Sequence, residues 1–261
     1  MTGAWAVTLR ELRALVRSPV AWTVTAIFLF LHGLFFVQLM ERYSANSLRI
    51  LSGTTAQDFT LVDRVVQPLL VGDTFVLMLL LPALTMRQMA DEWKSGTSDL
   101  LLTYPLSESQ IVLGKYLAAT FVVTAMVLLA ALHSAATAFF GQVEVPVALL
   151  GHLGLWLYAI MVLAAGLAMS TLTENQVIAF ASTFVILLTL VVIGDWGVEV
   201  DPPWGTVLRL VNFTGHVGHF AHGEWRLSST VFFVGAVVFF LHLAIGSLGR
   251  RRWRQTRRVA G

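Results

Sequence analysis

Six apolar stretches in this chain are each long enough to cross a bilayer as a helix. About 20 residues rising 1.5 Å each span roughly 30 Å of hydrocarbon. The bilayer core offers no water to the backbone, so a helix is the form that satisfies its polar groups. The predicted spans are residues 19–40, 68–89, 111–140, 147–171, 176–196 and 230–248. The sequence therefore predicts an all-α integral membrane protein with a single transmembrane domain over residues 1–261.

The composition agrees with a membrane protein and excludes thiol chemistry. The chain is 57% hydrophobic and 12% charged, with a mean hydropathy of +0.77. Soluble domains carry about 25% charged residues. The chain has no cysteine, which excludes disulfides, a thiol nucleophile and a thiolate metal site.

Basic residues predict the orientation of the six spans. An even number of spans places both termini on one side, and an excess of Lys and Arg marks the cytoplasmic side. Most basic residues lie in the segments that would then be inside, including the stretch Arg250–Arg258. We therefore expect both termini to be cytoplasmic.

The N-terminal segment is typical of a helix that lies in the membrane interface. An apolar stripe recurs at helical spacing: Trp5, Leu9, Leu12 and Val16. A separate basic stripe follows the same period: Arg10, Arg13 and Arg17. The apolar stripe suits the acyl boundary and the basic stripe suits anionic headgroups. Ser18 and Pro19 then predict a turn and a helix start. The alternative is that the first span extends inward without a break.

A polar segment, Asp91–Lys115, separates the second span from the third. Thr97 is a candidate cap for a short helix with Leu100, Leu101 and Leu102, and Pro105 ends that helix. Ser107 and Gln110 have the spacing of a capping box that starts the third span. Consecutive leucines beside acidic residues indicate a docking surface, although a plain solvated loop is the alternative. This segment contains no nucleotide-binding loop, because Gly114-Lys115 lacks the upstream glycine.

Two outer segments are longer than simple turns. Residues 42–67 predict a polar loop, and residues 197–229 predict either a loop or short re-entrant helices. The second segment contains His216, His219 and His222, which are either weak metal-ligand candidates or residues packed in the loop. Successive spacings of three rotate the first and third histidines about 120° apart on a helix, which disfavours a metal site.

Ionisable residues inside the spans are functional candidates by default. Asp73 lies in the second span near its outer end. It either sits hydrated at the outer interface or faces a dimer axis, where it would line a gate. For three single histidines within spans, we expect a hydrogen-bonded packing role or an interface role rather than a proton relay: His133, His152 and His242.

Several motifs resemble one family of membrane proteins. The polar segment carries most of them: Glu92, Ser95-Gly96-Thr97, Asp99 to Thr103, Pro105-Leu106-Ser107 and Ile111 to Lys115. Further matches are Arg17-Ser18-Pro19, Leu81 to Arg87, Leu172 to Gln176, Gly194-Asp195-Trp196 and Arg250 to Trp253. Together these resemble the permease subunits of the type-2 ATP-binding-cassette (ABC) transporter family. The similar branch is that of the gliding-motility permease GldF, which is related to NosY.

The resemblance implies a transport protein of the bacterial cytoplasmic (inner) membrane, namely an exporter subunit without enzymatic activity of its own.

 Two permease chains, identical or homologous, would form a dimer and work with a separate nucleotide-binding ATPase subunit. That subunit would bind ATP and Mg, and this chain would hold no cofactor. Membrane lipids and an outer-face accessory subunit are further expected partners, and nucleic acid is not.

The resemblance also implies which residues couple the ATPase to the spans. A coupling helix would enter a groove of the ATPase, and its expected residues are Glu92, Ser95, Gly96, Thr97, Asp99, Leu100, Leu101, Tyr104 and Pro105. The short loop with Glu174 and Asn175 is the expected second contact. Two alternatives stay open. One is a membrane scaffold for an ATP-driven outer-face machine, and the other is a metal-handling membrane protein that uses the three outer histidines.

Overall fold

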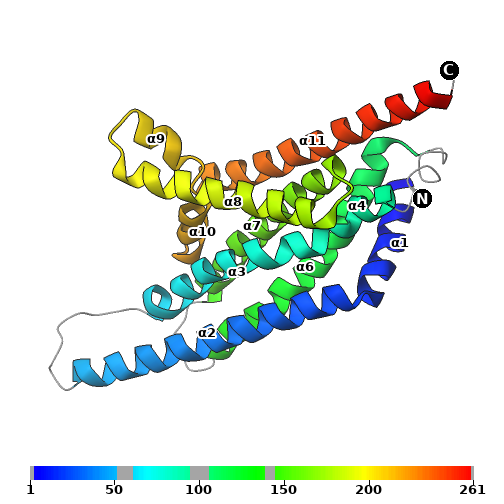
Figure 1. The fold of residues 1–261 in the computed structure, drawn as a ribbon. Helices are drawn as coiled ribbons and strands as arrows, with labels where there is room; N and C mark the ends of the chain where they lie inside the picture. Colours follow the sequence, from blue (N-terminus) through cyan, green and yellow to red (C-terminus); the bar gives the residue numbers. More distant parts are fainter. Residues whose placement is uncertain (1–2, 52–60, 95–105, 139–144, 260–261) are drawn as a thin grey trace.

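The computed structural model describes residues 3–51, 61–94, 106–138 and 145–259, and every regular element in these parts is helical (Figure 1). The elements, in chain order, are α1 (Gly3–Arg17), α2 (Pro19–Leu51), the π-helical η1 (Val62–Val66), α3 (Gln67–Thr85), α4 (Arg87–Lys94), α6 (Glu108–Ala138), α7 (Val145–Leu172), α8 (Gln176–Glu199), α9 (Trp204–Arg209), α10 (Phe213–Ala221) and α11 (Leu227–Val259). Six helical stretches in the described residues are long and apolar enough to span a membrane, at the six predicted places. The predicted all-α membrane fold is confirmed.

Two helices run further than the sequence predicted. Helix α2 continues to Leu51, so the prediction of a polar loop starting at residue 42 is wrong. No glycine or proline interrupts the chain between Gly33 and Gly53, and the helix therefore continues past its apolar part. Helix α11 likewise extends through its basic end to Val259.

Helix α7 forms the centre of the bundle and packs against α3, α6, α8, α10 and α11. In its most apolar window 67% of the residues are buried, compared with 22% for α2 and 28% for α8. Small residues allow the close packing: a side chain at Gly166 would collide with Thr85 of α3, and one at Gly154 would lie 2.5 Å from Cβ of Phe220 in α10.

The outer segment after α8 contains two short helices, α9 and α10, so the helical alternative is the one found. Helix α10 packs on α7 and α3, with Phe213 and Phe220 buried between them. Asn212 starts this helix by accepting a hydrogen bond from the N–H of Gly215 at 2.8 Å.

Helix α1 (blue) and the C-terminal part of α11 (red) lie at the same end of the bundle (Figure 1). The end of α4 and the start of α6 lie there too. We call this region the termini end.

Candidate functional site

The predicted coupling helix lies outside the described residues, but both of its flanks are described. Eight of the predicted coupling residues fall in the undescribed part: Ser95, Gly96, Thr97, Asp99, Leu100, Leu101, Tyr104 and Pro105. Helix α4 ends just before this segment and α6 begins just after it. The candidate site therefore consists of the groups that hold these two flanks.

A capping box begins α6, as the sequence predicted. The N–H of Gln110 donates to Oγ of Ser107 at 3.3 Å, and the N–H of Ser107 donates to Oε1 of Gln110 at 3.1 Å. These reciprocal bonds satisfy two backbone donors that a helix start would otherwise leave unpaired. They give α6 a defined first turn beside the coupling segment.

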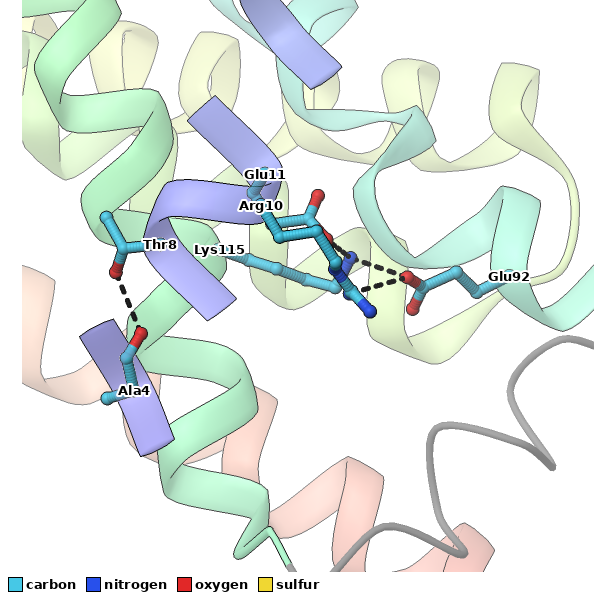
Figure 2. Close-up of polar contacts among 6 residues, drawn as sticks. All are labelled: Ala4, Thr8, Arg10, Glu11, Glu92 and Lys115. Carbon is cyan, nitrogen blue, oxygen red and sulfur yellow. Dashed lines mark hydrogen bonds and ion pairs between the residues drawn. The ribbon is translucent and has the colours of Figure 1, made fainter. Parts of the chain in front are cut away.

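An ion-pair cluster joins α6 to α4 and α1 (Figure 2). Nζ of Lys115 in α6 lies 2.8 Å from Oε1 of Glu92 in α4 and 3.2 Å from Oε1 of Glu11 in α1. Arg10 adds a second cation, 2.6 Å from Oε1 of Glu11 and 3.7 Å from Oε1 of Glu92. The cluster is neutral overall, and a single ammonium group connects three helices.

Burial makes this cluster more than a surface ion pair. The side chain of Lys115 is only 1% exposed, whereas Glu11 and Glu92 keep 15% and 20%. Burial alone would raise the pKa of Glu11, but Lys115 and Arg10 outweigh it, and the pKa lies below the ordinary value of 4.5. Glu11 is therefore ionised at neutral pH, and removing Lys115 would take from two partly buried carboxylates one of the two cations that they share.

Close packing aligns α1 with α6 at the cluster. A Cβ added to Gly114 would lie 2.6 Å from Cβ of Val7 and 2.9 Å from the carbonyl oxygen of Ala4. Thr8 is fully buried and satisfies its hydroxyl by donating to the carbonyl of Ala4 at 2.9 Å (Figure 2). The absence of a side chain at Gly114 thus lets α1 approach α6 closely enough for Glu11 to reach Lys115.

The C-terminal helix α11 contacts the other parts of the termini end. Arg252 lies 2.8 Å from Oε1 of Glu108, in the first turn of α6. Arg251 lies 3.3 Å from Oε1 of Glu174 and places its guanidinium carbon 4.7 Å from the ring centroid of Trp93 in α4. Helix α11 therefore contacts both flanks of the coupling segment.

The two residues predicted in the second contact have structural partners. Glu174 pairs with Arg251, and Asn175 caps α8 by accepting from the N–H groups of Val177 and Ile178. The next residue, Gln176, donates to Asp91 of α4. The loop between α7 and α8 is therefore tied to α4, near the first flank of the coupling segment.

Asp73 lies in the interior of the bundle and is bound to His32. Its Oδ2 is 2.7 Å from Nδ1 of His32 in α2, and neither side chain has any exposed surface. The ring of His133 in α6 lies 5.1 Å from that of His32, centroid to centroid. Within the chain, the carboxylate of Asp73 is therefore buried against α2, which supplies its partner.

The three outer histidines have protein partners in this structure. His216 bonds with Oγ of Ser229 at 2.9 Å through Nδ1 and with the carbonyl oxygen of Leu210 at 3.1 Å through Nε2. His219 contacts Glu224 at 3.6 Å, and His222 contacts Asp63 at 3.4 Å. In the parts of the chain that the structure describes, no group of three or more His, Cys, Asp or Glu side chains is arranged to hold a metal ion. The metal-handling alternative gains no support from this geometry.

The six long apolar helices define a multi-pass helical membrane protein. Residues 5–200 match the family model described as ABC-2 family transporter protein. The chain belongs to this family and is a membrane permease subunit of an ABC transporter, whose ATPase is a separate subunit. No curated protein matches the chain.

Sequence reasoning missed three residues of these sites: Glu11, Lys115 and His32. Glu11 had a detectable signal, because it is the sole acidic residue in the otherwise basic segment Gly3–Arg17. Lys115 was noted as part of the family motif and as a false nucleotide-loop match, and not as an ion-pair partner. His32 had the general signal of an ionisable residue in a span, but only the packing of α2 against α3 shows that it faces Asp73.

Proposed function

We propose that the cluster of Lys115, Glu11 and Glu92 transmits ATP-driven motion from the coupling segment to the spans. The main observation in support is that Lys115 is almost fully buried and that its ammonium group contacts a carboxylate on α1 and another on α4. Because α4 and α6 flank residues 95–105, a force on that segment reaches both helices. The cluster makes them move together, and it includes α1 in the same body.

The contacts of α11 support the same mechanism. Arg251 and Arg252 connect it to α4, to the loop after α7 and to the start of α6. A displacement of the coupling segment therefore reaches several spans as one rigid-body movement, which is how packed helices transmit small shifts. The ATPase would engage the predicted residues from Ser95 to Pro105, with the loop at Glu174 and Asn175 as the second contact.

The wider proposal is a dimeric exporter of the bacterial inner membrane with cytoplasmic termini. Basic residues gathered at the termini end support that orientation. Helices α2 and α8 bury little of their surface within one chain, which leaves room for a second permease chain. In its most specific form, the proposal places the chain in the branch of the gliding-motility permeases and adds an outer-face accessory subunit.

Asp73 and His32 are proposed to close the outer half of the pathway. They join α2 to α3 by a buried polar bond that must break if these helices separate. Any transport cycle that parts α2 from α3 then exposes two polar groups to the pathway.

The experiment is to purify the tagged chain in mild detergent with its co-expressed neighbouring ATPase and to measure ATP hydrolysis. We expect a stoichiometric ATPase with Walker motifs. Leu101→Asp should release the ATPase from the permease. Lys115→Met should retain the ATPase but lower permease-dependent hydrolysis by about tenfold, a barrier change of about 1.4 kcal/mol.

Two outcomes would contradict the proposal. A preparation without any ATPase would remove the ATP-coupled mechanism, and normal permease-dependent hydrolysis in Lys115→Met would remove the cluster from it. Arg226→Gln is the matched control, because that arginine forms an exposed ion pair with Glu224 on the outer segment. It should leave hydrolysis unchanged.

A further inference from the structure

Helix α1 presents three different faces to its surroundings. One face, with Val7 and Thr8, is buried. The next carries Leu12 and Val16 and borders a groove. Each of these two residues is followed by an arginine, and one residue rotates a helix by about 100°. The basic face therefore lies directly beside the groove face.

The groove is an apolar channel of about 370 Å³ between α1, α2 and α6. Leu12 and Val16 border it on α1, Trp22 on α2, and Phe121 and Leu129 on α6. Phe121 and Leu129 are eight positions apart, so the groove follows α6 for about 12 Å from α1 toward the interior of the membrane. Its volume lies within the roughly 300–1,000 Å³ of small-molecule sites.

Polar groups do not compete for this groove. The hydroxyl of Thr25 donates to the carbonyl of Ala21 at 2.8 Å, so its donor is already satisfied within α2. The indole N–H of Trp22 donates to the carbonyl of Val16 at 2.7 Å, across the bend between α1 and α2. Tryptophan side chains are enriched at the membrane–water interface, where one end is apolar and the other is polar. The groove therefore opens where acyl chains lie.

Two arginines beside the groove lack an anion. Among the described residues, Arg13 and Arg17 have no carboxylate within ion-pair distance, in contrast to Arg10, which binds Glu11. These three arginines line a second, open hollow of about 480 Å³ on α1. An apolar groove with two such arginines on the adjacent face of α1 is complementary to a molecule with an acyl chain and an anionic headgroup.

We propose that this groove binds one acidic phospholipid of the leaflet in which α1 lies. An acyl chain would occupy the channel between α1, α2 and α6. The phosphate group would lie against Arg13 and Arg17, whose guanidinium groups match phosphate geometry.

The bound lipid also regulates the coupling of the ATPase to the spans through the Lys115 cluster. The lipid face and Glu11 belong to the same helix, so an occupied groove favours the position of α1 in which Glu11 reaches Lys115. This regulatory step rests on the proposed function, whereas lipid binding does not.

Native mass spectrometry of the purified chain tests the binding, with phosphatidylglycerol and phosphatidylcholine of equal chain length as the probes. We expect one phosphatidylglycerol per chain to be retained preferentially. Arg13→Gln with Arg17→Gln should lower its apparent affinity at least tenfold. Ala125→Phe, which fills the groove from α6, should do the same.

Matched controls separate the site from general effects of charge and bulk. Arg42→Gln with Arg250→Gln removes the same charge elsewhere, and Leu128→Phe adds bulk on an exposed part of α6 outside the groove. Both controls should retain the lipid. Equal retention of the two lipids, or unchanged retention in the groove variants, would overturn the site. Cross-linking of a groove residue to a second copy of the chain would also overturn it.

The regulatory step has its own measurement. In the Thr8→Cys variant, phosphatidylglycerol should slow thiol labelling of this buried position severalfold relative to phosphatidylcholine. Specific binding without such protection would overturn the regulation alone. Loss of ATPase coupling with lipid binding intact would contradict the proposed function and leave the lipid site standing.

Discussion

Replacing Lys115 with methionine should detach α1 from α6. Methionine is unbranched like lysine, one heavy atom shorter and similar in helix propensity, but it carries no charge. Breaking a buried ion pair costs about 3–5 kcal/mol, because the remaining charge has no partner. Glu11 and Glu92 keep 15% and 20% exposure, and Arg10 stays nearby, so water and a second cation reduce the cost. We expect about 2 kcal/mol, which raises the detached population about 30-fold.

The absence of native cysteine allows a direct assay of this detachment. A cysteine replaces Thr8, which has no exposed surface while α1 is docked. Its rate of labelling by a water-soluble maleimide then reports the population in which α1 is open. A cysteine at the exposed Ala14 should label rapidly in every variant and serves as the control.

A double-mutant cycle separates the ion pair from unrelated damage. Glu11→Gln alone should accelerate labelling less than Lys115→Met does, because Lys115 retains Glu92. Together the two changes should cost less than the sum of the single costs, by about 1 kcal/mol. Wild-type labelling in Lys115→Met, or strictly additive effects, would refute the role of this ion pair in docking α1.

Three further predictions concern the docking of α1 and the buried pair of Asp73 and His32. Gly114→Val should also expose Thr8, because the new side chain meets Val7, and an unchanged labelling rate would contradict the close packing. Asp73→Asn should lower the thermal unfolding midpoint. The double variant Asp73→Leu with His32→Leu should recover much of that loss, because replacing both partners of a buried pair leaves no unpaired polar group. An equal loss of the midpoint in both variants would contradict a stabilising bond between Asp73 and His32. The free energy with which ionised Glu11 holds α1 on α6 is fully present above pH 4.5 and is lost as the pH falls through its lowered pKa. A spin label on α1 should therefore become mobile below about pH 4.5. Glu11→Gln should abolish that transition.

The sequence predicted the spans because each is a long apolar run with one physical solution in a bilayer. It also predicted local features that depend on neighbouring residues, such as the capping box of Ser107 and Gln110. The predicted end of α2 was wrong because loss of hydrophobicity marks the edge of the membrane, whereas the helix itself continues at least to Leu51. Apolar patterning therefore locates a membrane boundary better than it locates a helix boundary.

The polar contacts were hard to predict because each joins residues far apart in the chain. Glu11 and Lys115 meet through the packing of α1 on α6, which depends on the missing side chain of Gly114. His32 reaches Asp73 only because α2 lies against α3. Periodicity shows which face a residue occupies, and it does not show which helix covers that face.

The distribution of charge between the two ends of the bundle favours mechanical coupling at the termini end. Lys115, Arg251 and Arg252 each join elements that are distant in sequence, and all three lie around the flanks of residues 95–105. The outer segment's pair of Arg226 and Glu224 instead joins residues two apart, and its long-range contact, His222 with Asp63, is an ion pair only when the histidine is protonated. Long-range pairs make helices move together, and local pairs do not. The termini end is thus built to move as a unit, as a permease driven by an attached ATPase requires.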